Sequence, residues 1–303
     1  MNDLPLSSTV WSEAEWTTLI QDLRMTDQPA DDVAHSIDVT ELLIPDKAAA
    51  YLHTLQDIYE SDSLPLIASM FAKRYSYMIV APSLYAMTMF GKGLRITPDN
   101  CRVESIFKGD IWLPHLRVQQ KDALLLHNAD STSVTCDITN TCDITNTYEI
   151  TNPCSADESQ QQHAPEHAQQ APVNEAQRDA YLHTIFAEHL QPIWNSLSKA
   201  AGVSRAILWE NTAIYVYYVY ETMLSDPSYD YNRQRIEEDF AYLKGSAAAS
   251  LFGERWNPVS RFNTPKRPLP GSDTPRRVRQ TCCLYYQSAD DAAYCSVCPK
   301  REA

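Results

Sequence analysis

The stretch that decides the fold is PLIASMFAKRYSYMIVAPSLYAMTMF, residues 65–90, the most hydrophobic part of the chain. Lys73 and Arg74 interrupt it, and the apolar run from Tyr75 to Phe90 has only 16 residues. A helix needs about 20 apolar residues to cross a bilayer. Because Pro82 lacks a backbone donor, it bends a helix that contains it. The stretch therefore predicts a buried, bent helix in a globular core rather than a membrane span.

The residues around this stretch predict further helices and a small sheet. Ser12 and Glu15 are spaced as a capping box, which indicates a helix start. Pro45 suits the first turn of a second helix that continues to Ile58. Residues 101–126 have a strand-like pattern of apolar side chains, which predicts a small sheet or a pair of hairpins.

The C-terminal half has the spacing of long helices. Apolar residues recur at helical intervals from Glu175 to Leu197, and Gly202 follows at the position of a C-cap. Ser204 is placed to cap the next helix, and a further helix is expected at residues 232–252. The later prolines predict an extended loop to the C-terminus: Pro258, Pro265, Pro268, Pro270 and Pro275.

Residues 130–175 differ in kind from the rest of the chain. TCDITN at 135–140 is repeated at 141–146 and followed by TYEITN at 147–152, and a tract rich in Gln, His and Ala comes next. Because this segment has almost no large apolar residues, we expect a disordered insert. Its cysteines and its i,i+4 histidine pair are better explained by repeat expansion than by a metal site: Cys136, Cys142, Cys154, His163 and His167.

The expected fold class is predominantly α, of the α+β type: a helical domain with a small sheet and a C-terminal loop rich in cysteine. We expect an N-terminal half at 1–129, the insert at 130–175, and a C-terminal helical half at 176–303 whose cysteine motif occupies 254–303. The two halves are expected to form one domain around the insert. No basic start followed by an apolar run is present, so we expect no secretory signal.

Composition excludes several functions. The chain has 303 residues, a formal net charge of −14 and only 7 glycines. A general nucleic-acid or membrane-surface binder needs the opposite sign of charge. No glycine-rich motif for nucleotide phosphates is present, so we expect no internal site for NAD(P)H, FAD or ATP. Any electrons used in a redox reaction must then come from a partner.

Four of the 8 cysteines lie in the last 22 residues, in TCCLYYQSADDAAYCSVC at 281–298. Disulfides need an oxidising compartment, and the adjacent Cys282 and Cys283 are a strained pair to bridge. A zinc site usually takes two C-x-x-C pairs, whereas this first pair has no spacer. An iron–sulfur cluster tolerates irregular spacing better and is favoured. The thiolates of Cys282, Cys283, Cys295 and Cys298 are the expected ligands.

Positive charge precedes the cysteines. Residues 255–281 carry seven Lys or Arg residues against Asp273 alone, a net charge of +6. Cations beside an iron–sulfur cluster favour its reduced form, and they attract anionic ligands or acidic electron donors. The proposed contacts with substrate or donor are Trp256, Arg276, Arg277, Arg279, Tyr285 and Tyr286. The alternative is that these cations are ordinary solvated charges in a loop.

The run RRVRQTCCLYY at 276–286, followed by CSVCP at 295–299, resembles the C-terminus of the FhuF-type siderophore-iron reductases. Two other parts of the chain are similar to that family: Asn257-Pro258, and the stretch from Leu190-Gln191-Pro192 through Leu208-Trp209-Glu210-Asn211. A looser similarity is found in the N-terminal half, at Lys73-Arg74-Tyr75 and from Tyr85-Ala86 through Lys92-Gly93-Leu94. The resemblance covers about two-thirds of the chain and skips residues 130–175. The family spacing has ten residues between the second and third cysteines, whereas this chain has eleven, which a loop accommodates at little entropic cost.

The resemblance implies a cytoplasmic oxidoreductase with a [2Fe–2S] cluster that passes one electron to a ferric siderophore and releases Fe(II). It also implies an external donor (a ferredoxin, a flavodoxin or an NAD(P)H-dependent reductase), peripheral contact with a siderophore importer at the inner membrane, and no nucleic acid. Two alternatives remain open at this stage. One is a non-redox module with a structural four-cysteine zinc site, and the other is a siderophore-synthetase-like protein, which needs nucleotide-binding chemistry that the sequence lacks.

Overall fold

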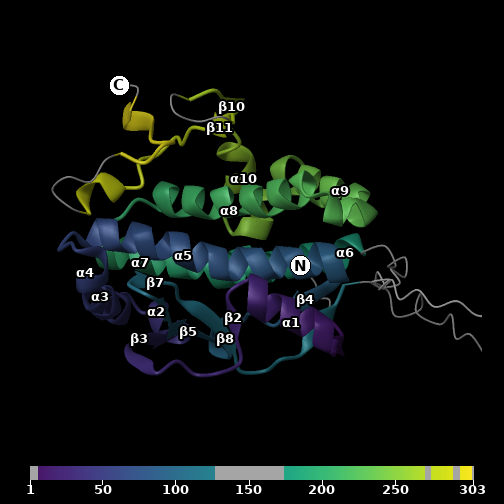
Figure 1. Cartoon of the computed structure of the whole chain (residues 1–303), viewed down its shortest axis with the longest axis horizontal. Helices are drawn as coiled ribbons and strands as arrows, with labels where there is room; N and C mark the ends of the chain where they lie inside the picture. Colours follow the sequence, from purple (N-terminus) through teal and green to yellow (C-terminus); the bar gives the residue numbers. More distant parts are fainter. Residues whose placement is uncertain (1–5, 127–173, 270–273, 289–293, 302–303) are drawn as a thin grey trace, which may run out of the picture.

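The computed structural model describes residues 6–126, 174–269, 274–288 and 294–301. Helix α5 (Leu64–Tyr85) runs through the middle of the molecule (Figure 1) and continues as the π-helical turn η1 (Ala86–Phe90). Sixteen of its residues are buried, and Pro82 lies inside it. The predicted buried helix at 65–90 is therefore confirmed. No helix in the described ranges is long and apolar enough to cross a bilayer.

Helices make up most of the structure, which confirms the expected fold class. Helix α8 (Arg205–Ser225) packs along α5, and α7 (Gln191–Ala201) contacts both of them (Figure 1). The other α-helices are α1 (Glu13–Asp22), α2 (Val39–Leu42), α3 (Pro45–Thr54), α4 (Gln56–Tyr59), α6 (Glu175–His183), α9 (Arg233–Lys244) and α10 (Pro258–Arg261). A second π-helical turn, η4 (Thr184–Leu190), joins α6 to α7.

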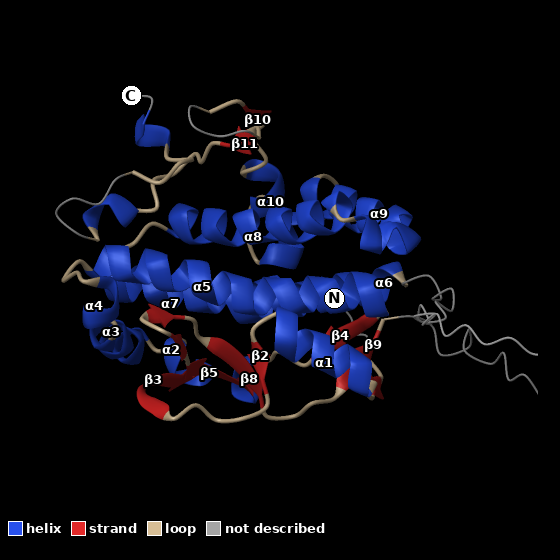
Figure 2. Cartoon of the chain, viewed as in Figure 1, coloured by secondary structure: helices blue, strands red, loops and turns tan. Residues whose placement is uncertain are grey.

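The strands of the first half of the chain gather on the side of α5 opposite α8, whereas β10 and β11 lie on the α8 side (Figure 2). One sheet has the order β2-β8-β5-β3 and another β1-β9-β4, and two short hairpins pair β6 with β7 and β10 with β11. The strands are β1 (Ser8–Thr9), β2 (Met25–Thr26), β3 (Asp32–Asp38), β4 (Lys92–Leu94), β5 (Cys101–Ser105), β6 (Phe107–Lys108), β7 (Ile111–Trp112), β8 (His115–Val118), β9 (Ala123–Leu125), β10 (Lys266–Arg267) and β11 (Arg276–Arg277). The strands predicted at 101–126 are confirmed, and their sheets also recruit β1–β4.

The predicted helix ends are confirmed by their hydrogen bonds and backbone angles. Ser12 and Glu15 form the reciprocal capping box of α1, and Pro45 opens α3. The Ser204 side chain accepts a hydrogen bond from Ala206 N at the start of α8. Gly202 ends α7 in the left-handed conformation. The aromatic run of α8, which has strand-forming residues, is held as helix by this cap and by packing on α5.

Gly91 and Gly93 have different roles. Gly91 ends the turn η1 with φ +63°, as expected for a glycine that closes a helix. Gly93 lies in strand β4, where a Cβ atom would come within 2.6 Å of the Tyr181 ring. The Tyr181 hydroxyl also accepts a hydrogen bond of 2.8 Å from Leu94 N. Gly93 is therefore fixed by this close approach of strand to ring, and not by a turn.

One hydrophobic core joins the two described halves of the chain. It contains residues from α3 and α5 of the first half and from α6–α9 of the second. The Asn174 N–H donates to the Leu126 carbonyl over 2.9 Å, so the described chain ends on either side of 127–173 are adjacent. The insert predicted at 130–175 lies almost entirely outside the described residues, as do its cysteines and histidines. The domain boundaries stay predictions.

The C-terminal region differs from the expected extended loop. Pro258 opens the short helix α10, because the Asn257 side chain accepts a hydrogen bond from Ser260 N over 3.0 Å. The strands β10 and β11 then form an antiparallel pair. The helix predicted at 232–252 is also shorter than expected: α9 ends at Lys244, and a 3₁₀ turn follows at Ala249–Phe252. The cysteine segment lies beyond one end of α8 (Figure 1).

Candidate functional site

The four C-terminal thiols lie close together as two pairs. The Sγ atoms of Cys283 and Cys295 are 3.9 Å apart, and those of Cys282 and Cys298 are also 3.9 Å apart. Two thiolates bound to one tetrahedral ion at a metal–sulfur distance of about 2.3 Å lie about 3.8 Å apart. Each pair therefore has the separation of two ligands on one ion, and each pair combines one residue of the Cys-Cys step with one of the C-x-x-C motif.

The thiols are reduced and largely enclosed. Cys283 and Cys298 are buried, Cys282 and Cys295 are half-buried, and all four are free thiols. Among the described residues, no three side chains of His, Cys, Asp or Glu converge on one point where a single ion would sit. The arrangement is two pairs of sulfurs, each with the separation of two ligands on one ion, which is compatible with a centre of two irons.

Cations and close contacts polarise one of these pairs. The contact with Cys295 is the largest effect that lowers the pKa of Cys283, and the charges of Lys73 and Arg279 lower it further. The same contact raises the pKa of Cys295. Burial raises the pKa of Cys282. The lowered pKa of Cys283 favours its thiolate, which is the form that binds a metal.

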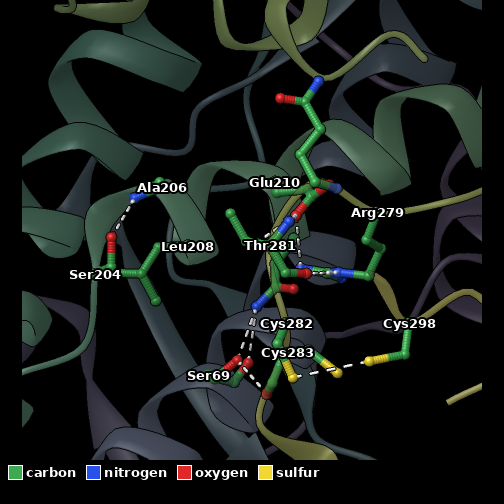
Figure 3. Close-up of polar contacts among 12 residues, drawn as sticks. Ser69, Ser204, Ala206, Leu208, Glu210, Arg279, Thr281, Cys282, Cys283 and Cys298 are labelled. Atoms are coloured by element: carbon green, nitrogen blue, oxygen red, sulfur yellow. Dashed lines mark hydrogen bonds and ion pairs between the residues drawn. The ribbon is translucent and has the colours of Figure 1, made fainter. Parts of the chain in front are cut away.

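A buried carboxylate on α8 holds the backbone that leads into Cys282 (Figure 3). Glu210 is 2% exposed, and its carboxylate accepts hydrogen bonds from Gln280 N over 2.6 Å and from Thr281 N over 2.8 Å. The Thr281 hydroxyl donates a further, very short bond to Glu210. The guanidinium of Arg279 lies 3.4 Å away as the counter-ion. One carboxylate thus fixes three consecutive residues before the cysteines.

Two further side chains hold the next residue of the loop. The Ser69 hydroxyl of α5 donates to the Cys283 carbonyl over 2.9 Å. The Asn211 side chain of α8 donates to the Ser69 carbonyl over 2.9 Å. All three residues are buried, so the two central helices of the core connect directly to the cysteine loop (Figure 3).

Among the predicted contact residues, the arginines lie in different environments. Arg279 is only 5% exposed and faces Glu210, so it is not part of a surface that a docked molecule touches. Arg277 is half-buried over the Tyr217 ring and bonds to Glu221 and the Thr264 carbonyl. Arg276 is exposed on β11. Arg276 and Arg277 differ in burial because adjacent positions of a strand face opposite sides.

The predicted aromatic contacts are more accessible. Tyr285 is 46% exposed. Tyr286 packs on Tyr294 with ring centroids 5.0 Å apart, and its hydroxyl accepts a hydrogen bond from Lys300 over 3.0 Å. Trp256 is half-buried beneath the guanidinium of Arg261, which lies 4.1 Å from the ring centroid. The structure thus brings Tyr285 and Tyr286 next to the cysteines, in the turn at Tyr285–Gln287.

A hollow of about 700 Å³ borders the cysteine loop. Tyr286 and Gln287 form one wall, and α4 with the residues after it forms the other. The lining residues from that second wall are Gln56, Asp57, Glu60, Ser61 and Asp62. This space is open and polar, and it lies within a few residues of the Cys282-Cys283 step.

Sequence reasoning assigned no role to Glu210, Ser69 or Asn211. A signal for Glu210 was present, because it is the one charged residue from Ala206 to Tyr220. A buried charge needs a partner, so such a residue indicates a buried ion pair. Nothing in the sequence identified its partner, since Arg279 is 69 positions away and is one of several arginines in its region.

The donor set and its surroundings define the class of site. Four thiols in two pairs, with a buried arginine next to them, suit a cluster of two irons, because thiolates are the usual ligands of such clusters and a cation offsets their negative charge. The residues present therefore fit an iron–sulfur centre.

Comparison with protein families agrees with this class. Residues 279–300 match the model described as the FhuF 2Fe-2S C-terminal domain, and residues 139–266 match the model described as the ferric iron reductase FhuF-like transporter. The resemblance drawn from the cysteine motif is therefore confirmed, and the cofactor is a [2Fe–2S] cluster. The match at residues 139–266 begins inside the segment 130–175, which the resemblance was expected to skip. Comparison with curated proteins finds no match.

Proposed function

We propose that the protein is a ferric-siderophore reductase that passes one electron from its [2Fe–2S] cluster to the chelated Fe(III). The two family matches support ferric iron reduction as the broad activity and an oxidoreductase as the enzyme class. The observation that carries the narrower proposal is the pair of 3.9 Å sulfur contacts beside an open hollow. Tyr286 and Gln287 of the cysteine loop line this hollow, so a molecule bound in it would lie against the loop that carries the proposed cluster.

The proposed ligands of the cluster are the four thiolates, with one sulfur pair on each iron. Cys283 and Cys295 would hold one iron, and Cys282 and Cys298 the other. When bound, the cluster supplies a single electron at low potential, which all-cysteine clusters reach at roughly −400 mV. Fe(III) becomes Fe(II), and the donor replaces the electron. Hard oxygen ligands hold Fe(II) less tightly, so the metal is released without any bond of the siderophore being cut.

The proposed substrate position is the hollow between α4 and the turn at Tyr285–Gln287. Tyr286 lines it directly and is positioned by Lys300 and Tyr294. This arrangement supports the expected contact of Tyr286 with substrate. Tyr285 lies on the same turn and is exposed, and we keep it as a second contact.

The proposed donor is an acidic one-electron carrier protein of the ferredoxin or flavodoxin class. From Arg255 to Arg301, the sequence has nine Lys or Arg against three Asp, a net charge of +6 in a chain of net charge −14. Such a charge contrast steers an acidic partner to one region of the surface. Replacing the exposed Arg255 and Arg261 with Ala should slow reduction of the cluster by such a donor severalfold at low salt and much less at high salt. Lys199→Ala on α7 is the matched control, because it removes an exposed cation elsewhere.

A cytoplasmic location, with peripheral contact between the protein and a siderophore importer at the inner membrane, is also proposed. The resemblance to the family is what supports it. Co-sedimentation with inner-membrane vesicles that contain or lack the importer tests the contact. Equal recovery on both kinds of vesicle would contradict it.

A single-turnover experiment tests the function. The protein is reduced anaerobically, freed of reductant, and mixed with a ferric siderophore and a dye that traps Fe(II). We expect about one Fe(II) per cluster, formed at the rate at which the visible absorption of the oxidised cluster returns. Cys298→Ala should release none. Full return of the absorption with no trapped Fe(II), or no reaction with any ferric siderophore, would overturn the proposal.

A further inference from the structure

The Glu210–Arg279 pair is unusual in its burial and its position. The two side chains are 3% and 2% exposed, and their charged groups lie 3.4 Å apart. Isolating an ion pair from water is costly unless hydrogen bonds satisfy both partners. Both carboxylate oxygens of Glu210 accept hydrogen bonds, one from Gln280 and two from Thr281. Arg279 Nη2 makes the 3.4 Å ion contact with Glu210 Oε2 but forms no hydrogen bond among the described residues.

Arg279 also connects the two halves of the cysteine motif. It precedes Cys282 by three residues, and its Nε atom donates to the Thr281 carbonyl over 3.0 Å. Its backbone N–H donates to the Val297 carbonyl over 3.0 Å, and Val297 directly precedes Cys298. A buried cation therefore lies at the point where the Cys-Cys step and the C-x-x-C motif meet.

We propose that this pair sets both the position and the charge of the cluster site. Glu210 is a positioning residue that holds the backbone before Cys282, and its negative charge offsets the Arg279 cation. Without that offset, a buried cation next to the thiolates favours the reduced cluster and raises its reduction potential. Glu210 thus keeps the potential low enough for the cluster to reduce Fe(III) that is tightly chelated. This inference rests on the cysteine ligands of the proposed function.

Opposite potential shifts from the two partners are the expected signature. Glu210→Gln removes the negative charge and leaves the cation, so the midpoint potential should rise. Arg279→Gln leaves a buried carboxylate next to the cluster, so the potential should fall. A change of about tenfold in the reduction equilibrium, which is about 59 mV for one electron, is expected in each case. The double variant should return close to the wild-type potential.

A second buried carboxylate supplies the matched control. Glu254 has a side chain 5% exposed and pairs with Arg205, and it also accepts a hydrogen bond from Trp209 over 2.8 Å. Its partner Arg205 begins α8, whereas Glu210 lies further along the same helix. Glu254→Gln should lower thermal stability, because it breaks a buried ion pair. The same substitution should leave the midpoint potential unchanged.

Potentiometric titration, followed by visible absorption and low-temperature EPR, decides the proposal. Shifts of the same sign in both variants, or no shift in either with a full complement of iron, would overturn it. If Arg279→Gln does not fold, Arg279→Lys keeps the cation and should hold the wild-type potential, and a shift in that variant as large as that in Glu210→Gln would contradict the proposal. A wild-type protein without a cluster would instead contradict the proposed function.

Discussion

The helical core and the cysteine segment are held together in different ways. Helices α5 and α8 pack through apolar side chains that are almost all fully buried. The cysteine segment has little regular structure, and polar contacts from Glu210 and Ser69 attach it to those helices. Burial of apolar area stabilises the core without any cofactor. The segment relies on a few hydrogen bonds, so we expect the cluster itself to supply much of its order.

The largest expected effect separates a site cysteine from a core cysteine. Cys298→Ala should abolish the cluster while the helical core keeps its far-UV circular dichroism. Cys101 is a fully buried thiol on strand β5 whose pKa is raised by burial. Cys101→Ala should keep the cluster and lower the free energy of unfolding by about 1 kcal/mol. Iron analysis and thermal melts of both variants check this. Retention of the cluster in Cys298→Ala would contradict the assignment of Cys298 as a ligand.

The next effect concerns a buried histidine of the core. The Ile96 carbonyl can only accept a hydrogen bond, so His189 Nδ1 donates to it, and Nε2 accepts from the Tyr75 hydroxyl over 2.6 Å. Burial lowers the pKa of His189 to about 4. Above pH 6.5, His189 is neutral in both the folded and the unfolded state, and its contribution to the free energy of unfolding is fully present. As the pH falls from 6.5 to 4, the unfolded chain gains a proton that the folded chain does not, so the protein should lose roughly 3 kcal/mol of stability.

Denaturant unfolding of the wild type at pH 7 and pH 4.5 measures that loss. His189→Gln should be less stable at pH 7 but should show a smaller loss on acidification. The exposed His53→Gln is the control and should keep the wild-type pH dependence. An unchanged pH dependence in His189→Gln would assign the acid sensitivity to other groups.

A smaller effect is expected from the strand–ring contact at Gly93. A Cβ atom there would lie 2.6 Å from Tyr181, so Gly93→Ala must displace a fully buried ring. We expect a loss of about 1–3 kcal/mol of stability with the iron content of the cluster unchanged. At Gly109, no atom lies within 4 Å of an added Cβ, so the only strain in Gly109→Ala comes from the positive φ of that residue. The loss of stability should therefore be smaller than for Gly93→Ala. Equal losses would show that the close approach contributes nothing.

The sequence predicted the core more completely than the site. Helix ends could be predicted because capping residues act on their immediate neighbours, as Ser12, Pro45, Gly202 and Ser204 do. The cysteine motif could be recognised because the spacing of its residues is local. Contacts between distant segments were not readable. Nothing local shows that Glu210 meets Arg279, or that Met25 pairs with Leu116 in a parallel strand pair. The burial of Arg279 could not be predicted for the same reason. The sequence of a basic segment is the same whether its arginines face water or pair with a buried carboxylate.

We propose that the two sulfur pairs, Cys283 with Cys295 and Cys282 with Cys298, hold one [2Fe–2S] cluster. Quantitative low-temperature EPR of the anaerobically purified protein after one-electron reduction, combined with iron and sulfide analysis, tests this directly. We expect two irons and two sulfides per chain and about one unpaired electron per chain. A colourless protein with stoichiometric zinc and no EPR signal on reduction would contradict it.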